Sequence, residues 1–162
     1  MVHTDRYVHL IHLTGKKKAD ADYTAACYIL SATIETTFQA SSYISNEGID
    51  FNALLEHGEL SHTEKSLVQF AYNLFSWDRK PGISPFEISR LGYPFMALAC
   101  NAVFISSGQY KVEILENENG EKQLHLDNIP YRKAFKCYQE FDAIMDAVLE
   151  EISQEEPVGL ER

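Results

Sequence analysis

The stretch Ser61–Ser76, SHTEKSLVQFAYNLFS, contains the start signal and most of one helix of this 162-residue chain. Ser61 and Glu64 have the Ser-x-x-Glu spacing of a capping box, in which each side chain accepts a hydrogen bond from the other residue's backbone N–H. The apolar residues that follow recur at three- and four-residue steps, the period of a helix buried on one face. We therefore expect a helix over residues 61–76 as one element of a mainly α fold. The apolar residues are Leu67, Val68, Phe70, Ala71, Leu74 and Phe75.

Upstream of this helix, residues 23–43 carry a second helical pattern, YTAACYILSATIETTFQASSY. Their apolar positions also follow three- and four-residue steps, and either Asp20 or Asp22 can act as the N-cap. The pattern predicts one helix that faces the core along a single stripe. The stripe comprises Ala26, Ile29, Leu30, Thr33, Ile34 and Phe38.

Downstream, residues 84–87, SPFE, repeat the capping box with a proline at the first helical position, where its missing N–H removes no intrahelical hydrogen bond. Pro94 is expected to break or kink this segment after Leu91. The run at residues 95–106, FMALACNAVFIS, is apolar on almost all sides, with Asn101 as its one strongly polar residue. This composition predicts the central, fully surrounded helix of the fold.

Beyond Gly108 the apolar period changes from about 3.6 to 2, which is typical of a half-buried strand. Apolar and polar residues alternate over residues 110–114 and again over residues 123–126, and the turn sequence NENG separates the two runs. A small β-hairpin within residues 108–128 is therefore expected.

Residues 131–154 form the longest amphipathic pattern, YRKAFKCYQEFDAIMDAVLEEISQ, with heptad-like apolar steps. Its charges oppose the helix macrodipole, because basic residues lie near the positive N-terminal end and acidic residues near the negative C-terminal end. Three carboxylates four residues apart, Asp142, Asp146 and Glu150, add repulsion along one side. The helix is expected either to clamp the helical core or to pair with another chain, and a basic partner would relieve its acidic end.

These elements predict a single domain over residues 1–162, built as a bundle of five to six helices. A helical core would occupy residues 1–107, the hairpin residues 108–128, the long helix residues 131–154, and a tail residues 155–162. The length suffices for one hydrophobic core.

Composition narrows the class of protein. A formal net charge of −10, with most of the acid in the last third of the chain, disfavours direct binding to nucleic acid. No apolar run reaches the roughly 18–20 residues of a membrane span, and the first residues lack the features of a signal peptide, so a cytoplasmic protein is expected. Cys27, Cys100 and Cys137 stand in apolar helical contexts and are predicted to be buried structural thiols.

Two motifs near the N-terminus suggest chemistry but lack the rest of a site. His9 and His12 have the spacing of metal ligands, yet no other pair supplies the three or four ligands that zinc needs. Gly15-Lys16 lacks the first glycine, the Ser or Thr and the preceding strand of a phosphate loop. Gly15 is better explained as a helix-ending residue in the left-handed conformation, followed by lysines at the negative end of the helix dipole. No metal or cofactor is assigned.

Other candidate sites are weaker. Common catalytic motifs are absent, and the glutamates around the hairpin turn are expected at the surface. Trp77, beside Asp78 and Arg79, either fills the edge of the core or anchors a partner. A pocket in which His57, His62 and Asn101 converge would support a small-molecule-binding protein or a hydrolase.

The succession YTAACYILSAT, GIDFNALLEHGELSHTEKSLVQFAYNLFSW and ISPFEISRLGYPFMALACNAVFI, covering about residues 5–107, resembles a family of small, mostly helical bacterial and phage-associated proteins of unknown function. The shared pattern is an acidic residue before a Tyr-Ile-Leu-Ser/Ala-Ala helix, a central Ala-x-Asn-Leu-Phe/Tyr helix and a terminal Ala-Leu-x-x-Asn-Ala-type helix. The resemblance implies a helical fold and a bacterial or phage origin. The hairpin and the long helix after residue 107 depart from it.

These observations favour a non-enzymatic accessory or regulatory protein that acts through protein–protein interaction, with a protein partner or with a second copy through the C-terminal helix. The expected surface is the acidic row Asp142, Asp146 and Glu150, with Trp77 as an anchor. A second hypothesis is an acidic mimic of nucleic acid that inhibits a basic nuclease or repressor. A third is the small-molecule site at His57, His62 and Asn101.

Overall fold

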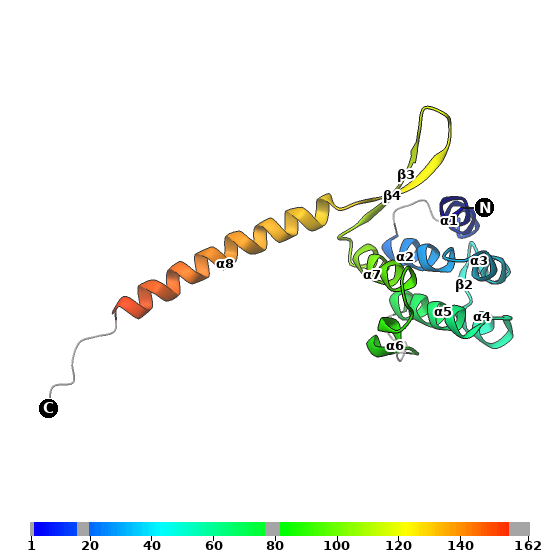
Figure 1. Cartoon of the computed structure of the whole chain (residues 1–162), viewed down its shortest axis with the longest axis horizontal. Helices are drawn as coiled ribbons and strands as arrows, with labels where there is room; N and C mark the ends of the chain where they lie inside the picture. The colour runs from blue at the N-terminus through cyan, green and yellow to red at the C-terminus, as the bar shows by residue number, and fades with distance from the viewer. Residues whose placement is uncertain (1, 16–19, 77–81, 156–162) are drawn as a thin grey trace.

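The computed structural model describes residues 2–15, 20–76 and 82–155, which form helices and two small antiparallel sheets (Figure 1). The mainly α fold, with a hairpin before a long C-terminal helix, is confirmed. The described residues form eight helices rather than five or six, because one expected helix is divided and short helices occur between the longer ones. The elements are α1 (His3–Leu13), α2 (Ala21–Leu30), α3 (Ile34–Ser41), β1 (Ile44–Ser45), β2 (Gly48–Ile49), α4 (Phe51–His57), α5 (His62–Phe75), α6 (Pro85–Ser89), α7 (Phe95–Ser106), β3 (Lys111–Glu116), β4 (Lys122–Asp127) and α8 (Ile129–Glu155).

Both capping boxes are confirmed. At the start of α5 the Glu64 carboxylate accepts a hydrogen bond from the Ser61 backbone N–H at 2.7 Å, and the Ser61 hydroxyl accepts one from the Glu64 N–H at 3.4 Å. Ser84 and Glu87 make the same reciprocal pair at the start of α6. Helix α6 ends at Ser89 and α7 starts after Pro94, as the proline predicts.

The prediction of a single helix over residues 23–43 is wrong, because the chain turns between α2 and α3. The Ser31 hydroxyl donates to the Tyr28 carbonyl at 3.0 Å, and the Thr33 hydroxyl accepts from the Thr36 N–H at 3.0 Å as the N-cap of a new helix. The stripe therefore does not continue into α3, where Phe38 is 76% exposed and Thr36 is buried.

The central helix is α2 rather than α7, so the prediction of a fully surrounded helix at residues 95–106 is wrong. Every side chain from Thr24 to Leu30 in α2 is buried, whereas Met96, Cys100 and Val103 of α7 are exposed. Helix α7 is the more apolar of the two in sequence, but α2 is the helix with neighbours on several sides. Helices α1, α5 and α7 pack around α2 (Figure 1).

Helix α1 is attached to the C-terminal end of α2 and to the hairpin. The Arg6 guanidinium donates to the backbone carbonyls of Ser31 at 2.7 Å and Ala32 at 2.9 Å. The Thr4 hydroxyl accepts from the Leu124 N–H of β4 at 2.9 Å. The expected left-handed Gly15 after this helix is confirmed by its φ of 62°.

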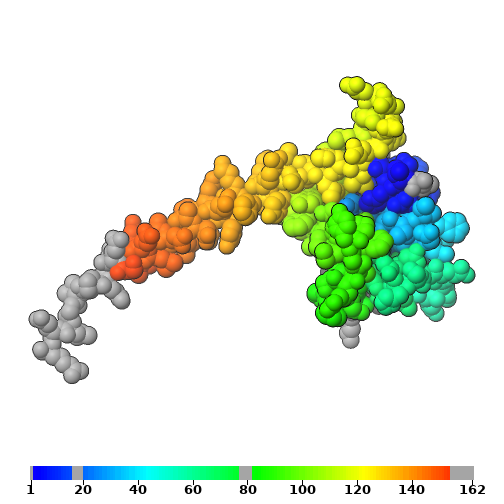
Figure 2. Space-filling view, in the orientation of Figure 1, coloured from blue at the N-terminus to red at the C-terminus, as the bar shows by residue number. Residues whose placement is uncertain are grey.

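The expected hairpin is formed by β3 and β4, with Lys111 opposite Asp127 and Glu116 opposite Lys122. Its inward-facing side chains are half-buried against the helical core, and the glutamates around its turn are exposed as predicted. The long helix expected over residues 131–154 is confirmed as α8, which begins two residues earlier and ends one residue later. It projects away from the other elements (Figures 1 and 2).

Candidate interaction surface

The start of α8 is fixed by backbone and side-chain hydrogen bonds. The Asp127 carboxylate accepts from the Ile129 N–H at 2.9 Å, and the Arg132 N–H donates to the Asn128 carbonyl at 3.0 Å. The Tyr131 N–H donates to the Gln109 carbonyl at 3.1 Å, which ties the first turn to the segment before β3. These bonds set the direction in which α8 leaves the helical core.

Four aromatic side chains, hereafter the base cluster, support this junction. Phe104 of α7 and Tyr110 stack with ring centroids 4.8 Å apart, and Tyr131 meets Phe104 edge-on at 5.5 Å. Tyr131 in turn stacks on Phe135 at 6.1 Å. Such ring pairs each contribute about 0.5–1.5 kcal/mol beyond the burial of their area. The base cluster therefore holds the first two turns of α8 against the helical core.

Beyond the base cluster α8 has no cover. Every side chain from Tyr131 to Ser153 is exposed, so the helix does not clamp the helical core (Figure 2). Exposed fractions reach 63% at Tyr138 and 60% at Phe141, values of a helix in solvent rather than of a core helix. We define the α8 apolar face as the large exposed apolar side chains of this helix from residue 131 onward: Tyr131, Phe135, Tyr138, Phe141, Ile144, Met145, Val148, Leu149 and Ile152.

The α8 apolar face is continuous along the helix. Tyr138, Met145 and Ile152 are seven residues apart, and Phe141 and Val148 fill the intervening heptad position. At 1.5 Å per residue the helix is about 40 Å long. An exposed apolar patch of this length is unusual on a soluble monomer and is characteristic of an interface.

Charge is distributed unequally along α8. Its N-terminal half carries three basic residues and Glu140, and Lys136 and Glu140 form an exposed ion pair at 3.7 Å. Its C-terminal half carries acidic residues and no Lys or Arg. Asp142, Asp146 and Glu150 are all exposed on successive turns, with Asp142 at the edge of the α8 apolar face. Trp77, the expected anchor of this acidic row, lies outside the described residues.

The uncovered side of α7 is a second, smaller apolar area. Met96, Cys100 and Val103 lie on consecutive turns and are exposed. The prediction of three buried thiols is therefore correct for Cys27 and wrong for Cys100 and Cys137, which are both exposed. An apolar neighbourhood in the sequence does not show which side of a helix the fold leaves uncovered.

The three residues of the hypothetical small-molecule site, His57, His62 and Asn101, have separate surroundings in the structure. His57 is exposed with Glu56 at 3.9 Å, and His62 is exposed at the start of α5. The Asn101 amide on α7 instead donates to the Tyr28 hydroxyl of α2 at 3.2 Å. Asn101 thus makes a half-buried polar contact between α7 and α2.

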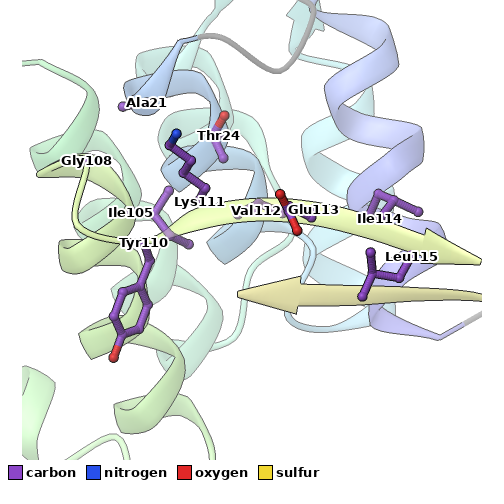
Figure 3. A pocket seen from close by; sticks show the side chains of 10 residues that line it. All are labelled: Ala21, Thr24, Ile105, Gly108, Tyr110, Lys111, Val112, Glu113, Ile114 and Leu115. Atoms are coloured by element: carbon purple, nitrogen blue, oxygen red, sulfur yellow. The ribbon is translucent and has the colours of Figure 1, made fainter. Parts of the chain in front are cut away.

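The best-defined cavity, of about 680 Å³, lies beside β3 (Figure 3). Thr24 and Ile105 contribute side chains from α2 and α7, and Lys111 and Glu113 are the charged residues of its wall. These two charged groups could form polar contacts with a ligand. Within the described residues, moreover, no group of three or more His, Cys, Asp or Glu side chains could hold a metal ion.

The strongly shifted titratable groups lie in the core rather than in the cavity. Burial raises the pKa of Tyr7 to about 12 and the pKa of Cys27 to about 12. Burial also lowers the pKa of His3, whose Nε2 lies 3.0 Å from the Tyr28 carbonyl. Desolvation is the main cause in each case, which is the signature of structural groups kept neutral.

Sequence reasoning found the apolar periodicity of α8 but placed the interaction surface on its acidic row. The signal for the apolar face was present in the heptad-like spacing of its large apolar residues. The sequence did not predict the base cluster, because Phe104, Tyr110 and Tyr131 come together only when the hairpin brings the chain back beside α7.

None of the helices in the described ranges has the length and apolar character to cross a membrane. Comparison with known protein families, with characterised proteins and with solved structures finds no match for this chain.

Proposed function

We propose that this protein is a non-enzymatic accessory or regulatory protein that acts through protein–protein interaction, and that the α8 apolar face is its interaction surface. The observation that carries the proposal is the exposure of nine large apolar side chains on one projecting helix. In a folded chain such a face is stabilised by covering it, at about 25 cal/mol per Å² of apolar area removed from water. The proposal extends to a cytoplasmic protein of bacterial or phage origin.

The arrangement of α8 supports an interaction role in a second way. A lone helix in water is marginally stable, and most helices in proteins are held by packing of an amphipathic face. Past the base cluster α8 continues for several turns without such packing. A partner that covers the apolar face would supply the missing stabilisation.

The acidic half of α8 supports a second candidate function. Its carboxylates, including Asp142, Asp146 and Glu150, are exposed on a projecting rod. A row of this kind can imitate a phosphate backbone and occupy the binding site of a basic nuclease or repressor. This decoy function predicts an association that depends strongly on salt, whereas an apolar interface depends on it weakly.

The test is affinity capture from the native host with the full-length chain, washed in parallel at low and high salt and read by mass spectrometry. One variant carries Phe141→Gln, Val148→Gln and Ile152→Gln, which remove apolar area but keep a helix-compatible side chain. A second carries Asp142→Asn, Asp146→Asn and Glu150→Gln. Phe38→Gln, on the exposed side of α3, is the matched control.

The proposal predicts a stoichiometric partner, or a second copy of the chain, that survives high salt with the wild-type and control chains and is lost with the apolar-face variant. A partner lost at high salt, and lost with the acidic-row variant, would favour the decoy function. Capture that none of the variants alters would refute α8 as the surface.

A further inference from the structure

We propose that the α8 apolar face is covered by α8 of a second copy of this chain, with the two helices antiparallel. This inference rests on the proposed function and names the occupant of its surface. The resulting contact is isologous, because a twofold axis crosses the pair near the middle of α8 and each copy presents the same face.

The size of the face fits a pair of helices. Beyond the base cluster the face has seven apolar side chains. If each loses on the order of 80–100 Å² to solvent on pairing, they supply about 560–700 Å² per chain. This area is within reach of the roughly 600–1,000 Å² per partner of standard interfaces. A second α8 therefore matches the face in length and approaches the area of a standard interface.

Charge favours the antiparallel arrangement. In a parallel pair the two acidic halves would lie side by side, and so would the two basic halves. In an antiparallel pair Arg132, Lys133 and Lys136 of one copy lie beside the acidic half of the other, where Glu150 and Glu151 are found. Packed helices are about 8–10 Å apart, which is comparable to the Debye length of about 8 Å at physiological salt. The antiparallel pair also opposes the two macrodipoles, which relieves the unfavourable charges at each end.

The apolar residues fit one antiparallel register in which the two heptad positions of the face meet each other. This register places Ala134 against Ile152, Tyr138 against Val148, and Phe141 against Met145, with each pair occurring twice by symmetry. In every layer a larger side chain meets a smaller or flexible one, which suits close packing. Asp142 then lies near its own symmetry mate, at the edge of the α8 apolar face.

Other occupants fit less well. Folding back of α8 onto its own helical core would break the base cluster and the Tyr131 to Gln109 hydrogen bond. A helix that lies on an anionic membrane carries basic residues along its polar side, whereas the charged residues in the C-terminal half of α8 are all carboxylates. A second copy of α8 would both cover the apolar face and place opposite charges beside each other.

The register is tested by crosslinking the full-length chain. Cys100→Ser removes the exposed thiol on α7 and leaves Cys137 on α8 and the buried Cys27. Adding Glu151→Cys places a second thiol at the same heptad position as Cys137, two heptads along the helix. In the antiparallel register these two positions face each other across the pair, while within one helix they are roughly 21 Å apart. A short bis-maleimide reagent and peptide mapping then report the link.

The expected result is a covalent dimer joined between position 137 of one copy and position 151 of the other, and little dimer from Cys100→Ser alone. Light scattering should give a mass near twice 18.5 kDa for the untreated wild-type chain. Met145→Glu should weaken self-association at least a hundredfold, whereas Phe38→Glu should leave it unchanged.

Three outcomes would overturn the inference. A dimer without the 137–151 link would refute the antiparallel register. A monomer at all concentrations that still captures another protein through the α8 apolar face would refute the second copy as occupant while the proposed function stands. A monomer whose α8 binds anionic vesicles would replace the second copy with a membrane surface.

Discussion

Replacement of Arg6 by methionine should destabilise the fold substantially, because Arg6 joins α1 to the end of α2. Its guanidinium donates to the carbonyls of Ser31 and Ala32 at 2.7 and 2.9 Å, and its side chain is buried. The last carbonyls of a helix have no intrahelical donor, and a cation there also interacts with the negative end of the macrodipole. Methionine keeps the unbranched stem but removes the donors.

The expected cost follows from these two bonds. A hydrogen bond to a charged group contributes about 1.5–3 kcal/mol, and an acceptor left buried without a donor adds to the loss. Methionine, unlike arginine, has no charge to desolvate on folding, and this difference offsets part of the lost hydrogen-bond energy. We therefore expect Arg6→Met to lower the free energy of unfolding by about 2–4 kcal/mol, out of a typical total of about 5–15 kcal/mol. The melting temperature should fall by about 5–15 °C.

Urea unfolding followed by far-ultraviolet circular dichroism measures this difference directly. Arg90→Met is the matched control, because Arg90 is exposed and its guanidinium lies 4.9 Å from the centre of the Phe86 ring. Loss of that exposed contact should cost less than about 1 kcal/mol. Equal effects of the two substitutions, or a loss below about 1 kcal/mol for Arg6→Met, would refute the structural role assigned to Arg6.

Three further predictions concern titration, thiols and self-association. Burial lowers the pKa of His3 from 6.5, so the unfolded chain binds the proton more tightly than the folded chain. The free energy of unfolding should therefore be highest above pH 6.5 and decrease as the pH falls through the folded-state pKa. Urea titrations should show that the free energy of unfolding depends less on pH in His3→Gln than in wild type. An Ellman assay of the native chain should label Cys100 and Cys137 rapidly and Cys27 only after unfolding. Asp142→Asn should tighten self-association in sedimentation experiments by removing repulsion at the twofold axis, and unchanged or weaker association would contradict the register.

Local signals predicted several elements well. Ser61 with Glu64 and Ser84 with Glu87 mark two helix starts because the capping chemistry is complete within four residues. The hairpin was predictable from its change of period and from the turn ending at Gly120, which has a φ of 78°. In each case the deciding interactions join residues that are close in the sequence.

Predictions that depended on distant packing were less successful. The break at Ser31 and Thr33 is stabilised partly by Arg6, which lies about 25 residues away, so periodicity alone missed it. The apolar run of α7 was expected at the centre, but α2 occupies that place. Apolar helical patterns do not reveal which helix has neighbours on every side.

For the candidate surface, too, features set by local sequence were predictable and features set by distant packing were not. The amphipathic pattern of α8 was readable because heptad spacing is local, and its conflict with the macrodipole was visible from Arg132 and Glu150 alone. Whether α8 packs on its own chain depends on the direction in which the helix starts after the hairpin. That direction is set by the base cluster and by the Asp127 side chain, which caps the helix start.

Hydrogen–deuterium exchange of α8 at low and high protein concentration is the most direct test of the claim that its apolar face is an interface between copies. A solvated helix exchanges its amides quickly, whereas a packed helix is protected. An interface between copies predicts that residues 135–152 gain protection as concentration rises, while the amides of α2 exchange equally slowly at both concentrations. Exchange in α8 that is the same at both concentrations would contradict it.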